Sequence, residues 1–444
     1  MRSRSVLAAA LAGGLALVAG VGVAQTTFLH HPPPPGAVTT APQFLTAPLP
    51  PGSSPEVQRG RYLAIAGDCA ACHTPEGKPP FSGGLGLHTP FGVIYSSNLT
   101  SDRDAGIGAW TPDQFWRAMH EGRRADGAHL YPAFPYPNFT RASRADSDAL
   151  LAYLKTVPAV HAVAPSNALP FPFNIRAMMM GWNLLFFRPA AFQPAADRSA
   201  EWNRGAYLVQ TFGHCGACHT PKNVLGADSR GHDFQGGKLE SWYAPNLTED
   251  PHVGLGRWSQ ADVVEFLKTG RNQYAQAAGT MAEVITDSTS LMTDADLAAM
   301  ATYLKSLPAA GGPTQVRTAD AGSMRAGKAV YEDVCAGCHR EGGQGVARFF
   351  PNLAGHPDVE SRDPNNVVRV VLEGARTAPT PTRPTPLSMP SYAWQLNDRQ
   401  IADVLTYVRQ SWGNQAEPVS PGEVAGLRRS LKLQTSHGST WARQ

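Results

Sequence analysis

The chain has 444 residues, of which 42% are hydrophobic, and this is enough for packed cores in roughly two to four domains. Its 38 basic and 35 acidic residues give a formal charge of +3 without a basic block, which argues against a surface that binds nucleic acid by neutralising phosphates. The 43 glycines and 38 prolines indicate many loops, but this content stays below that of disordered or collagen-like chains.

The start of the chain has the pattern of an export leader. Arg2 and Arg4 are followed by an apolar run from Val6, which ends in small residues at Ala24. This pattern predicts a secretory signal peptide over residues 1–24, with an uncleaved membrane anchor as the alternative. Residues 25–55 contain the runs PPPP and PLPP, a composition that favours an extended linker without a core of its own.

Three similar units follow the linker. Each has a short amphipathic helix, a cysteine motif, a loop rich in Gly, Pro and Asn, and one or two closing helices. The repeat predicts a mainly α fold of three tandem domains. We expect domain 1 over 56–165, an inter-domain segment over 166–198, domain 2 over 199–312, domain 3 over 320–415 and a C-terminal tail over 416–444.

Helix signals are clearest in the second unit. The stretch 258–270 reads WSQADVVEFLKTG, in which Ser259 is a helix cap and Gly270 is a stop. Another helix is expected after Thr293. The apolar segment Ala177–Phe187 would form a helix of only ~16 Å, which is too short to span a bilayer. It is either a buried packing helix between domains or an interfacial segment that touches lipid or a partner subunit. The short basic stretch GLRRSLK in the tail is expected to be a solvated end.

All six cysteines occur in three copies of the pattern C-x-x-C-H. This pattern is the signature of covalent c-type haem attachment, because two thiols at this spacing can add to the two vinyl groups of one porphyrin and the adjoining imidazole can bind the iron. A zinc site would need further ligands, a redox dithiol does not need the histidine, and no other cysteine is present for disulfides. We therefore predict three covalently bound haem c groups, held by Cys69 and Cys72 with His73, Cys215 and Cys218 with His219, and Cys335 and Cys338 with His339.

Each haem iron needs a sixth ligand, which in cytochromes c is commonly methionine. Met389, in the sequence SMPSY, follows His339 in the third unit and comes just before a predicted helix. Met281, in the sequence GTMAE, follows His219 in the second unit, and Met292 competes with it. The equivalent position in the repeat favours Met281 and Met389 as axial ligands.

The first unit departs from this pattern. Phe134 follows His73 at almost the same offset as Met281 follows His219, and a phenylalanine cannot bind iron. The sixth ligand of the first haem is therefore unknown from the sequence, and the site could also be five-coordinate. The candidates are His129, Met119, His120 and one of the methionines at 178–180. An imidazole ligand or an empty position would lower the potential of this haem, and His129 could equally be a loop residue near a propionate.

The sequence resembles a known family over about residues 56–415. The stretches that carry the resemblance are GHCGACHTPKN, GLGRWSQADVVEFLKTGR, TYLKSLPA, FFPNLAGHP and LTYVRQSWGN. They are similar to the triheme cytochrome c subunits of membrane-bound periplasmic dehydrogenases of acetic acid bacteria, which serve alcohol, aldehyde, gluconate or sugar dehydrogenases. The resemblance implies three class-I-like cytochrome c domains, each wrapped around a covalent haem. It also carries the axial roles of the three motif histidines, Met281 and Met389 over to this chain.

The resemblance further implies an electron-transfer subunit with no catalytic site of its own. Its partners would be a large catalytic subunit with a quinone, flavin or molybdenum cofactor, a small subunit, and ubiquinone at the periplasmic side of the inner membrane. The family has methionine in a YPAMPY motif where this chain has Phe134. The YPAF form looks like cytochromes of molybdenum-dependent aldehyde or heterocycle dehydrogenases, which favours aldehyde over alcohol oxidation. A free-standing multihaem carrier to a terminal oxidase and a peroxidase-like enzyme remain alternatives.

Overall fold

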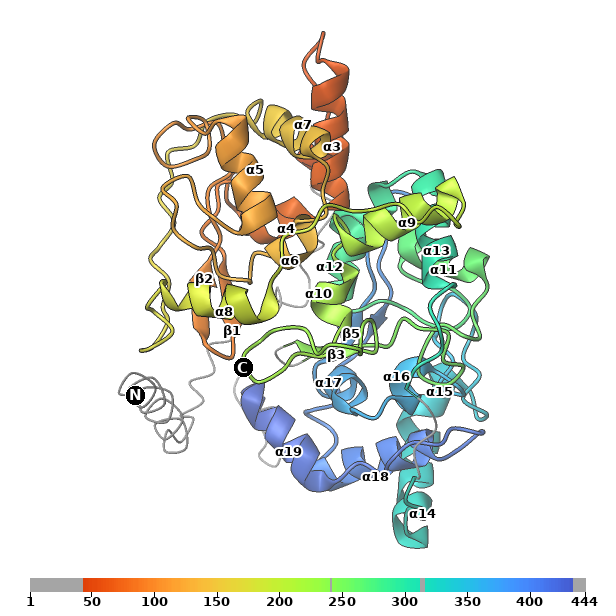
Figure 1. Ribbon diagram of the computed structural model, residues 1–444. Coiled ribbons are helices and arrows are strands. Elements are labelled where there is room, and N and C mark those ends of the chain that lie inside the picture. Colours follow the sequence, from red (N-terminus) through yellow and green to blue (C-terminus); the bar gives the residue numbers. More distant parts are fainter. Residues whose placement is uncertain (1–42, 240–241, 312–315, 434–444) are drawn as a thin grey trace, which may run out of the picture. The chain divides into compact units, whose positions relative to one another are not determined.

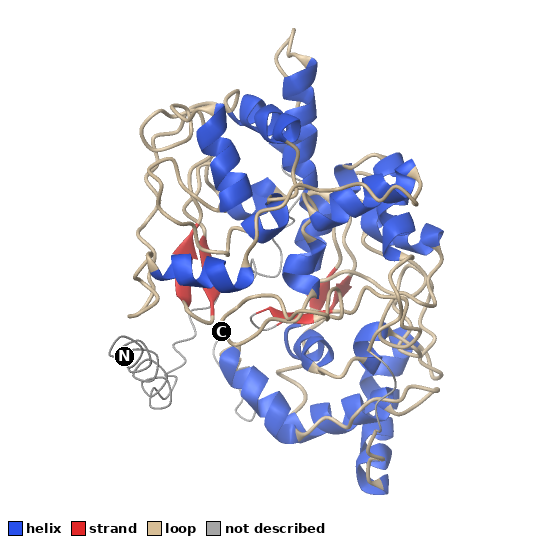
Figure 2. Cartoon of the chain, in the orientation of Figure 1, coloured by secondary structure: helices blue, strands red, loops and turns tan. Residues whose placement is uncertain are grey.

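The computed structural model describes residues 43–239, 242–311 and 316–433 (Figure 1), so the predicted leader and the first part of the linker lie outside the described residues. The described chain is mainly helical, with three small antiparallel hairpins, which confirms the predicted fold class (Figure 2). Within these ranges, none of the helices combines the length and the apolar character that crossing a bilayer requires.

The first unit is framed by two crossing helices, α3 (Pro55–Ala66) and α7 (Arg144–Leu154), and α5 (Pro112–Glu121) packs against α7. The remaining elements are α2 (Gln43–Thr46), α4 (Cys69–His73), the hairpin β1 (Gly86–Thr89) and β2 (Gly92–Tyr95), and α6 (Tyr136–Phe139). Side-chain caps begin the three long helices, from Ser54, Thr111 and Ser143. Local sequence therefore sets where each helix begins, as the repeat pattern predicts.

The second unit repeats this arrangement. Its framing helices are α9 (Ala200–Gln210) and α13 (Asp294–Leu304), and α11 (Gln260–Thr269) packs against α13. Ser259 caps α11 and Gly270 ends it with a φ of 72°, which confirms both expected signals, and Thr293 caps α13. The other elements are α10 (Cys215–His219), β3 (Gly237–Leu239), β4 (Trp242–Ala244), α12 (Thr280–Asp287) and a 3₁₀ turn, η1 (Thr289–Leu291).

The third unit has its own core and a different first helix. In it α14 (Ala321–Val330) continues through a π-helical turn, η2 (Tyr331–Cys335), into α15 (Ala336–His339) without a break. The unit is completed by α16 (Pro357–Glu360), α17 (Asn365–Glu373), β5 (Ala375–Arg376), β6 (Ser388–Met389), α18 (Asp398–Arg409) and α19 (Pro421–Ser430). Its buried residues form a hydrophobic cluster distinct from the one that the first two units share.

A glycine closes the helix crossing in every unit, at Gly60, Gly205 and Gly327. A Cβ at these positions would come within about 2 Å of a carbonyl oxygen on the helix that crosses the first one, at Ala149 of α7, Ala299 of α13 and Asp403 of α18 respectively. Because no Cβ fits at such a distance, the backbones can approach this closely only at glycine. The short Arg-Gly and Ala-Gly motifs at the start of each repeat are therefore packing positions.

Two segments differ from the expectations drawn from composition. The apolar segment forms α8 (Met178–Phe186), but only Met179 of this helix is buried, so the interpretation as a buried packing helix is wrong. The basic stretch of the tail is not a solvated end either. It lies in α19, where Val424 is fully buried and the guanidinium of Arg428 donates to the carbonyls of Ala393 and Leu396 at 2.8 and 2.9 Å.

Candidate haem-binding sites

The cysteine motifs of the first two units lie on isolated single-turn helices. Each turn follows a residue in the left-handed conformation, Asp68 before α4 and His214 before α10. In the third unit the π-helical turn η2 takes the place of this break, and Gly327 is closer to its cysteine motif in sequence than the equivalent glycines of the other units are. None of the six cysteines forms a disulfide, so all six thiols are available for another covalent bond.

The three motif histidines share one hydrogen-bond pattern. In each case Nδ1 lies within hydrogen-bond distance of a backbone carbonyl oxygen. The pairs are His73 with Ser97 at 2.6 Å, His219 with Pro245 at 2.6 Å and His339 with Pro351 at 3.0 Å. A carbonyl only accepts, so Nδ1 carries the proton and Nε2 keeps its lone pair for a metal. Burial lowers the pKa of all three imidazoles, which keeps them neutral and able to bind iron.

An asparagine fixes the acceptor loop in the first two units. The Asn98 amide accepts from the backbone N–H of Thr100 at 2.8 Å and donates to the carbonyl of Val160 at 2.7 Å. Asn246 accepts from Thr248 and donates to Ala310 in the same way, at 2.7 and 2.6 Å. The repeated Asn-Leu motif is visible in the sequence, but this role was not predicted from it. The signal that could have indicated it is the asparagine that recurs at the same place in the repeat, Asn98 and Asn246.

Burial dominates the electrostatics of the thiols. It raises the pKa of Cys69, Cys72, Cys215 and Cys335 to about 12, and it also raises the pKa of Cys218. Thiols with a raised pKa are poor nucleophiles at neutral pH, which argues against a redox dithiol in these positions. Paired thiols followed by a neutral imidazole with an available Nε2 are a donor set that fits a covalent haem.

The motifs of the first and second units lie next to each other. The pKa of Cys72 is raised mainly by burial, and then by Asp68 and by the Cys218 thiol of the second unit. The imidazole of His214 hydrogen-bonds the backbone of Gly67, and α12 contacts α4. The two candidate sites are thus neighbours, joined by residues just before the first cysteine of each motif and by the contact of α12 with α4.

Met281 and Met292 occupy different environments in the second unit. Met281 is half-buried in the first turn of α12, after Gly279, whose backbone packs so closely on Trp242 that a Cβ there would lie 2.4 Å from the indole ring. Met292 is 2% exposed within the core shared with the first unit, and its carbonyl accepts from Lys268. This difference supports Met281 as the ligand and Met292 as a core side chain.

Met389 lies on a two-residue strand that pairs with the residues after α17. The register places Met389 opposite Ala375, and Gly374 is required beside it because a Cβ would lie 2.5 Å from the Met389 carbonyl. The Tyr392 hydroxyl then donates to the carbonyl of Val334 at 3.1 Å. This bond ties the methionine loop to the residue immediately before Cys335, as a sixth ligand for the same haem requires.

In the first unit Phe134 is half-buried and packs on Phe139, with ring centroids 5.3 Å apart. Of the candidate ligands, Met119 lies among the buried residues of α5, and the His120 ring stacks on Trp116 while its Nδ1 donates to the carbonyl of Thr140 at 2.7 Å. His129 Nδ1 lies 3.2 Å from the side-chain amide of Asn183, on α8. These contacts do not distinguish one candidate from the others as a ligand, so the sixth ligand of the first haem stays open.

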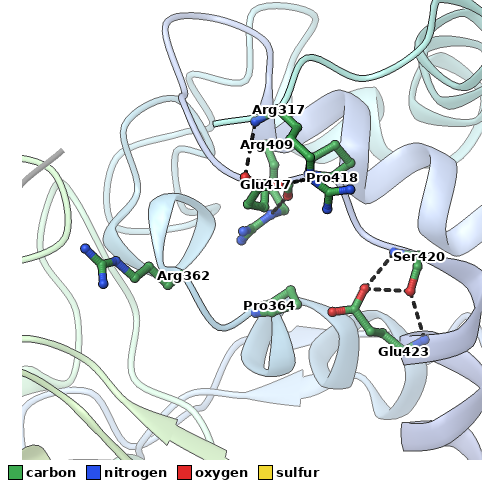
Figure 3. A pocket seen from close by; sticks show the side chains of 8 residues that line it. All are labelled: Arg317, Arg362, Pro364, Arg409, Glu417, Pro418, Ser420 and Glu423. Carbon is green, nitrogen blue, oxygen red and sulfur yellow. Dashed lines mark hydrogen bonds and ion pairs between the residues drawn. The ribbon is translucent and has the colours of Figure 1, made fainter. Parts of the chain in front are cut away.

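A cavity of about 450 Å³ lies between the helices at the end of the third unit (Figure 3). Its charged groups are already engaged with one another or with the backbone. Arg317 pairs with Glu417 at 2.8 Å, and Glu423 accepts from the backbone N–H of Ser420 at 2.8 Å. The fully buried guanidinium of Arg409 donates to three carbonyls, which explains why α18 and the tail pack together. This cavity is separate from the cysteine motifs.

The cytochrome c family profile matches this chain three times, over residues 57–158, 203–308 and 324–412. Each match contains one of the C-x-x-C-H motifs. This result confirms the expected three tandem cytochrome c domains, and with them the prediction of three covalently bound haem c groups.

Characterised proteins align with most of the chain. The gluconate 2-dehydrogenase cytochrome c subunit of Pantoea cypripedii is 39% identical over 86% of this chain and 92% of that protein. The alcohol dehydrogenase (quinone) cytochrome c subunit of Gluconacetobacter polyoxogenes is 40% identical over 86% of both chains. The fructose dehydrogenase cytochrome subunit of Gluconobacter japonicus is 40% identical over 84% of this chain and 83% of its own length. The predicted resemblance to dehydrogenase cytochrome subunits is therefore confirmed.

Proposed function

The chain belongs to the cytochrome c family with three haem c domains, and on that premise we propose that it is the electron-transfer subunit of a periplasmic, membrane-bound dehydrogenase of the aldehyde or alcohol type. It would accept electrons from a large catalytic subunit, assembled with a small subunit, and pass them to ubiquinone in the inner membrane. The observation that carries the proposal is the threefold repeat of one donor set, paired cysteines and a histidine whose Nδ1 donates to a loop carbonyl.

The roles of the residues follow from their chemistry. Each cysteine pair would hold one haem through two thioethers, and the imidazoles of His73, His219 and His339 would bind the iron through Nε2. Met281 and Met389 would supply a thioether sulfur in the second and third units, which would raise the potential relative to an imidazole or open position. When bound, each haem supplies an iron that carries one electron, so the chain itself needs no acid–base chemistry.

Contacts between the units support a relay rather than three independent carriers. The first and second motifs are neighbours, because the His214 imidazole hydrogen-bonds the backbone of Gly67 and α12 contacts α4. The loop that precedes Met389 reaches the second unit, where Ala378 packs in a small apolar cluster with Ile285 and Met281. The methionine segments of the second and third units therefore lie close together, so that electrons can move between all three units within one chain.

The test is reduction of the three haems by substrate. The holo-subunit is co-purified with its large catalytic subunit, and haem absorbance is followed after addition of an alcohol, an aldehyde or gluconate, and then of a short-chain ubiquinone. We expect reduction by an aldehyde or alcohol, followed by quinone-dependent reoxidation. Reduction only by gluconate or a sugar would show that the complex is not of the aldehyde or alcohol type. Isolation without a catalytic subunit, with reoxidation only by a terminal oxidase, would indicate a free-standing carrier.

A further inference from the structure

Helix α8 presents apolar side chains on both of its sides. Its inner side is anchored to the first unit, where Met179 is buried and the Asn183 amide accepts from the Tyr136 hydroxyl at 2.5 Å. Its outer side carries exposed Met178, Met180, Leu184 and Leu185. A helix that is apolar all round normally lies in a core or in lipid, but this one has an outer face with no protein cover within the described chain.

Neighbouring loops extend this exposed surface. The Phe173 ring packs on Phe91, with centroids 4.9 Å apart, at the turn of the β1–β2 hairpin. The Trp182 indole N–H donates to the carbonyl of Leu225 at 3.0 Å. We define the α8 patch as the exposed residues Phe171, Phe173, Ile175, Met178, Met180, Leu184, Leu185, Val224 and Leu225. Exposed apolar side chains gathered on one helix and its neighbouring loops mark an interaction site.

The segment that carries most of the patch has only cationic charges, and next to Val224 and Leu225 the carboxylate of Asp228 pairs with Lys222. Residues 164–196 contain no Asp or Glu, and the only charged side chains there are Arg176 and Arg188 at the two ends of α8. Arg230 adds a third cation, because its guanidinium donates to the carbonyl of Leu185 at 2.9 Å. Cations beside exposed apolar side chains match the headgroup region of an anionic bilayer.

The shape of the patch also favours lipid. Phe171 is 78% exposed, Leu184 84% and Val224 92%, so these side chains project outward rather than line a groove. Interfaces between proteins concentrate their binding energy in side chains that fit well-packed pockets, whereas a bilayer accepts projecting apolar groups without a complementary shape.

We propose that the α8 patch is the membrane contact of this subunit, with its apolar residues at the level of anionic headgroups and Arg176, Arg188 and Arg230 against phosphates. This proposal rests on the membrane location in the proposed function and adds the surface that makes the contact. Asn183 also lies beside His129 on the loop that leads to Phe134. The patch would therefore hold the first unit, rather than the third, against the bilayer.

The test is binding of the haem-loaded chain without its expected leader to vesicles of phosphatidylglycerol and phosphatidylethanolamine, measured by co-sedimentation. The double variant Leu184→Glu/Leu185→Glu should weaken binding on the order of tenfold or more, because it places carboxylates in the apolar layer. Arg188→Glu should weaken it less and reduce its salt dependence. The matched control is Phe349→Glu, at a side chain of the third unit that is 58% exposed, and it should bind as the unaltered chain does.

Two results would overturn the proposal. Unchanged vesicle binding by the double variant, with its haem spectrum and melting temperature intact, would show that α8 does not touch lipid. If the catalytic subunit in detergent no longer reduced the haems of the double variant, the patch would instead be identified as a protein interface. If no dehydrogenase reduces even the unaltered chain, the proposed function fails while the vesicle result still stands, so the two failures are distinguishable.

Discussion

The Tyr62 hydroxyl on α3 donates a 2.5 Å hydrogen bond to the carboxylate of Asp296, which follows far along the chain on α13. The second unit makes the equivalent contact in the other direction, because the Tyr207 hydroxyl donates to Asp146 of the first unit at 2.5 Å. Each carboxylate also accepts from an arginine of its own unit, Arg59 or Arg204. The first two units are therefore joined by a reciprocal pair of contacts between equivalent positions of the repeat.

Removing one hydroxyl from this pair should loosen the joint between the units. Tyr62→Phe should cost about 1–2 kcal/mol of unfolding free energy, because a hydrogen bond to a charged acceptor is lost while Arg204 still pairs with Asp296. Denaturant unfolding followed by far-UV circular dichroism measures the change. Tyr95→Phe is the control. An equal loss of stability in both variants would show that the joint does not depend on this hydroxyl.

The same carboxylate predicts a pH dependence. Burial raises the pKa of Asp296, but hydrogen bonds from Arg204 and Tyr62 outweigh it and lower the pKa below its ordinary value of 3.8. The ionised form is thus favoured in the folded chain, so its stabilisation is complete above the ordinary pKa and is lost as the pH falls through the lowered folded pKa. The melting temperature of the unaltered chain should fall more steeply below about pH 4 than that of Asp296→Asn. Parallel curves would contradict this assignment.

The crossing glycines predict a local packing defect. Gly327→Ala would place a Cβ 2.1 Å from the carbonyl oxygen of Asp403, so α14 and α18 must move apart, at a cost of about 1–3 kcal/mol or more. The control is Gly181→Ala on α8, where nothing lies within 4 Å of an added Cβ. Thermal unfolding should show a lower midpoint for the first variant alone. A tolerated alanine at 327 would mean that the helices do not cross this closely.

The loop asparagines predict a site-specific electrochemical effect. Asn246→Ala removes both bonds that hold the Pro245 loop, so the acceptor of the His219 Nδ1 proton shifts and the basicity of that imidazole changes. A redox titration should show one altered haem potential. Asn98→Ala should alter a different one. Three unchanged potentials in both variants would show that the loops do not act on the histidines.

Phe134 predicts a difference between the first haem and the other two. Phe134→Met should raise the potential of the first haem, on the order of 100 mV, because it places a thioether at the position that Met281 has in the second unit. Met281→Leu should lower that of the second, while Met292→Leu should leave all three potentials in place and affect stability only. A high first potential in the unaltered chain would mean that another sulfur already serves that iron.

The sequence predicted the parts of this fold that are encoded locally. The C-x-x-C-H motifs, the cap at Ser259 and the stop at Gly270 each depend on a few adjacent residues, and the structure has them in place. The exposure of α8 could not be predicted, because so short an apolar segment fits a core and a surface equally well. The burial of Arg428 depends on the carbonyls of Ala393 and Leu396, which lie 35 and 32 residues earlier in the sequence. A local sequence pattern cannot reveal a contact over this separation.

The carbonyl acceptors of the three histidines were also beyond sequence reasoning. Backbone atoms of Ser97, Pro245 and Pro351 carry no side-chain signal, although an asparagine and a leucine follow each of them in the sequence. The repeat was nevertheless enough to align the first unit with the second and to identify Phe134 as the departure.

The most direct test of the central claim is the intact mass of the exported chain after acid–acetone extraction. Six thioether bonds predict a polypeptide that retains the mass of three haem groups, with one group lost in each double variant that replaces a cysteine pair by alanine. A mass equal to that of the bare polypeptide, or retention of fewer than three haems by the unaltered chain, would contradict the account.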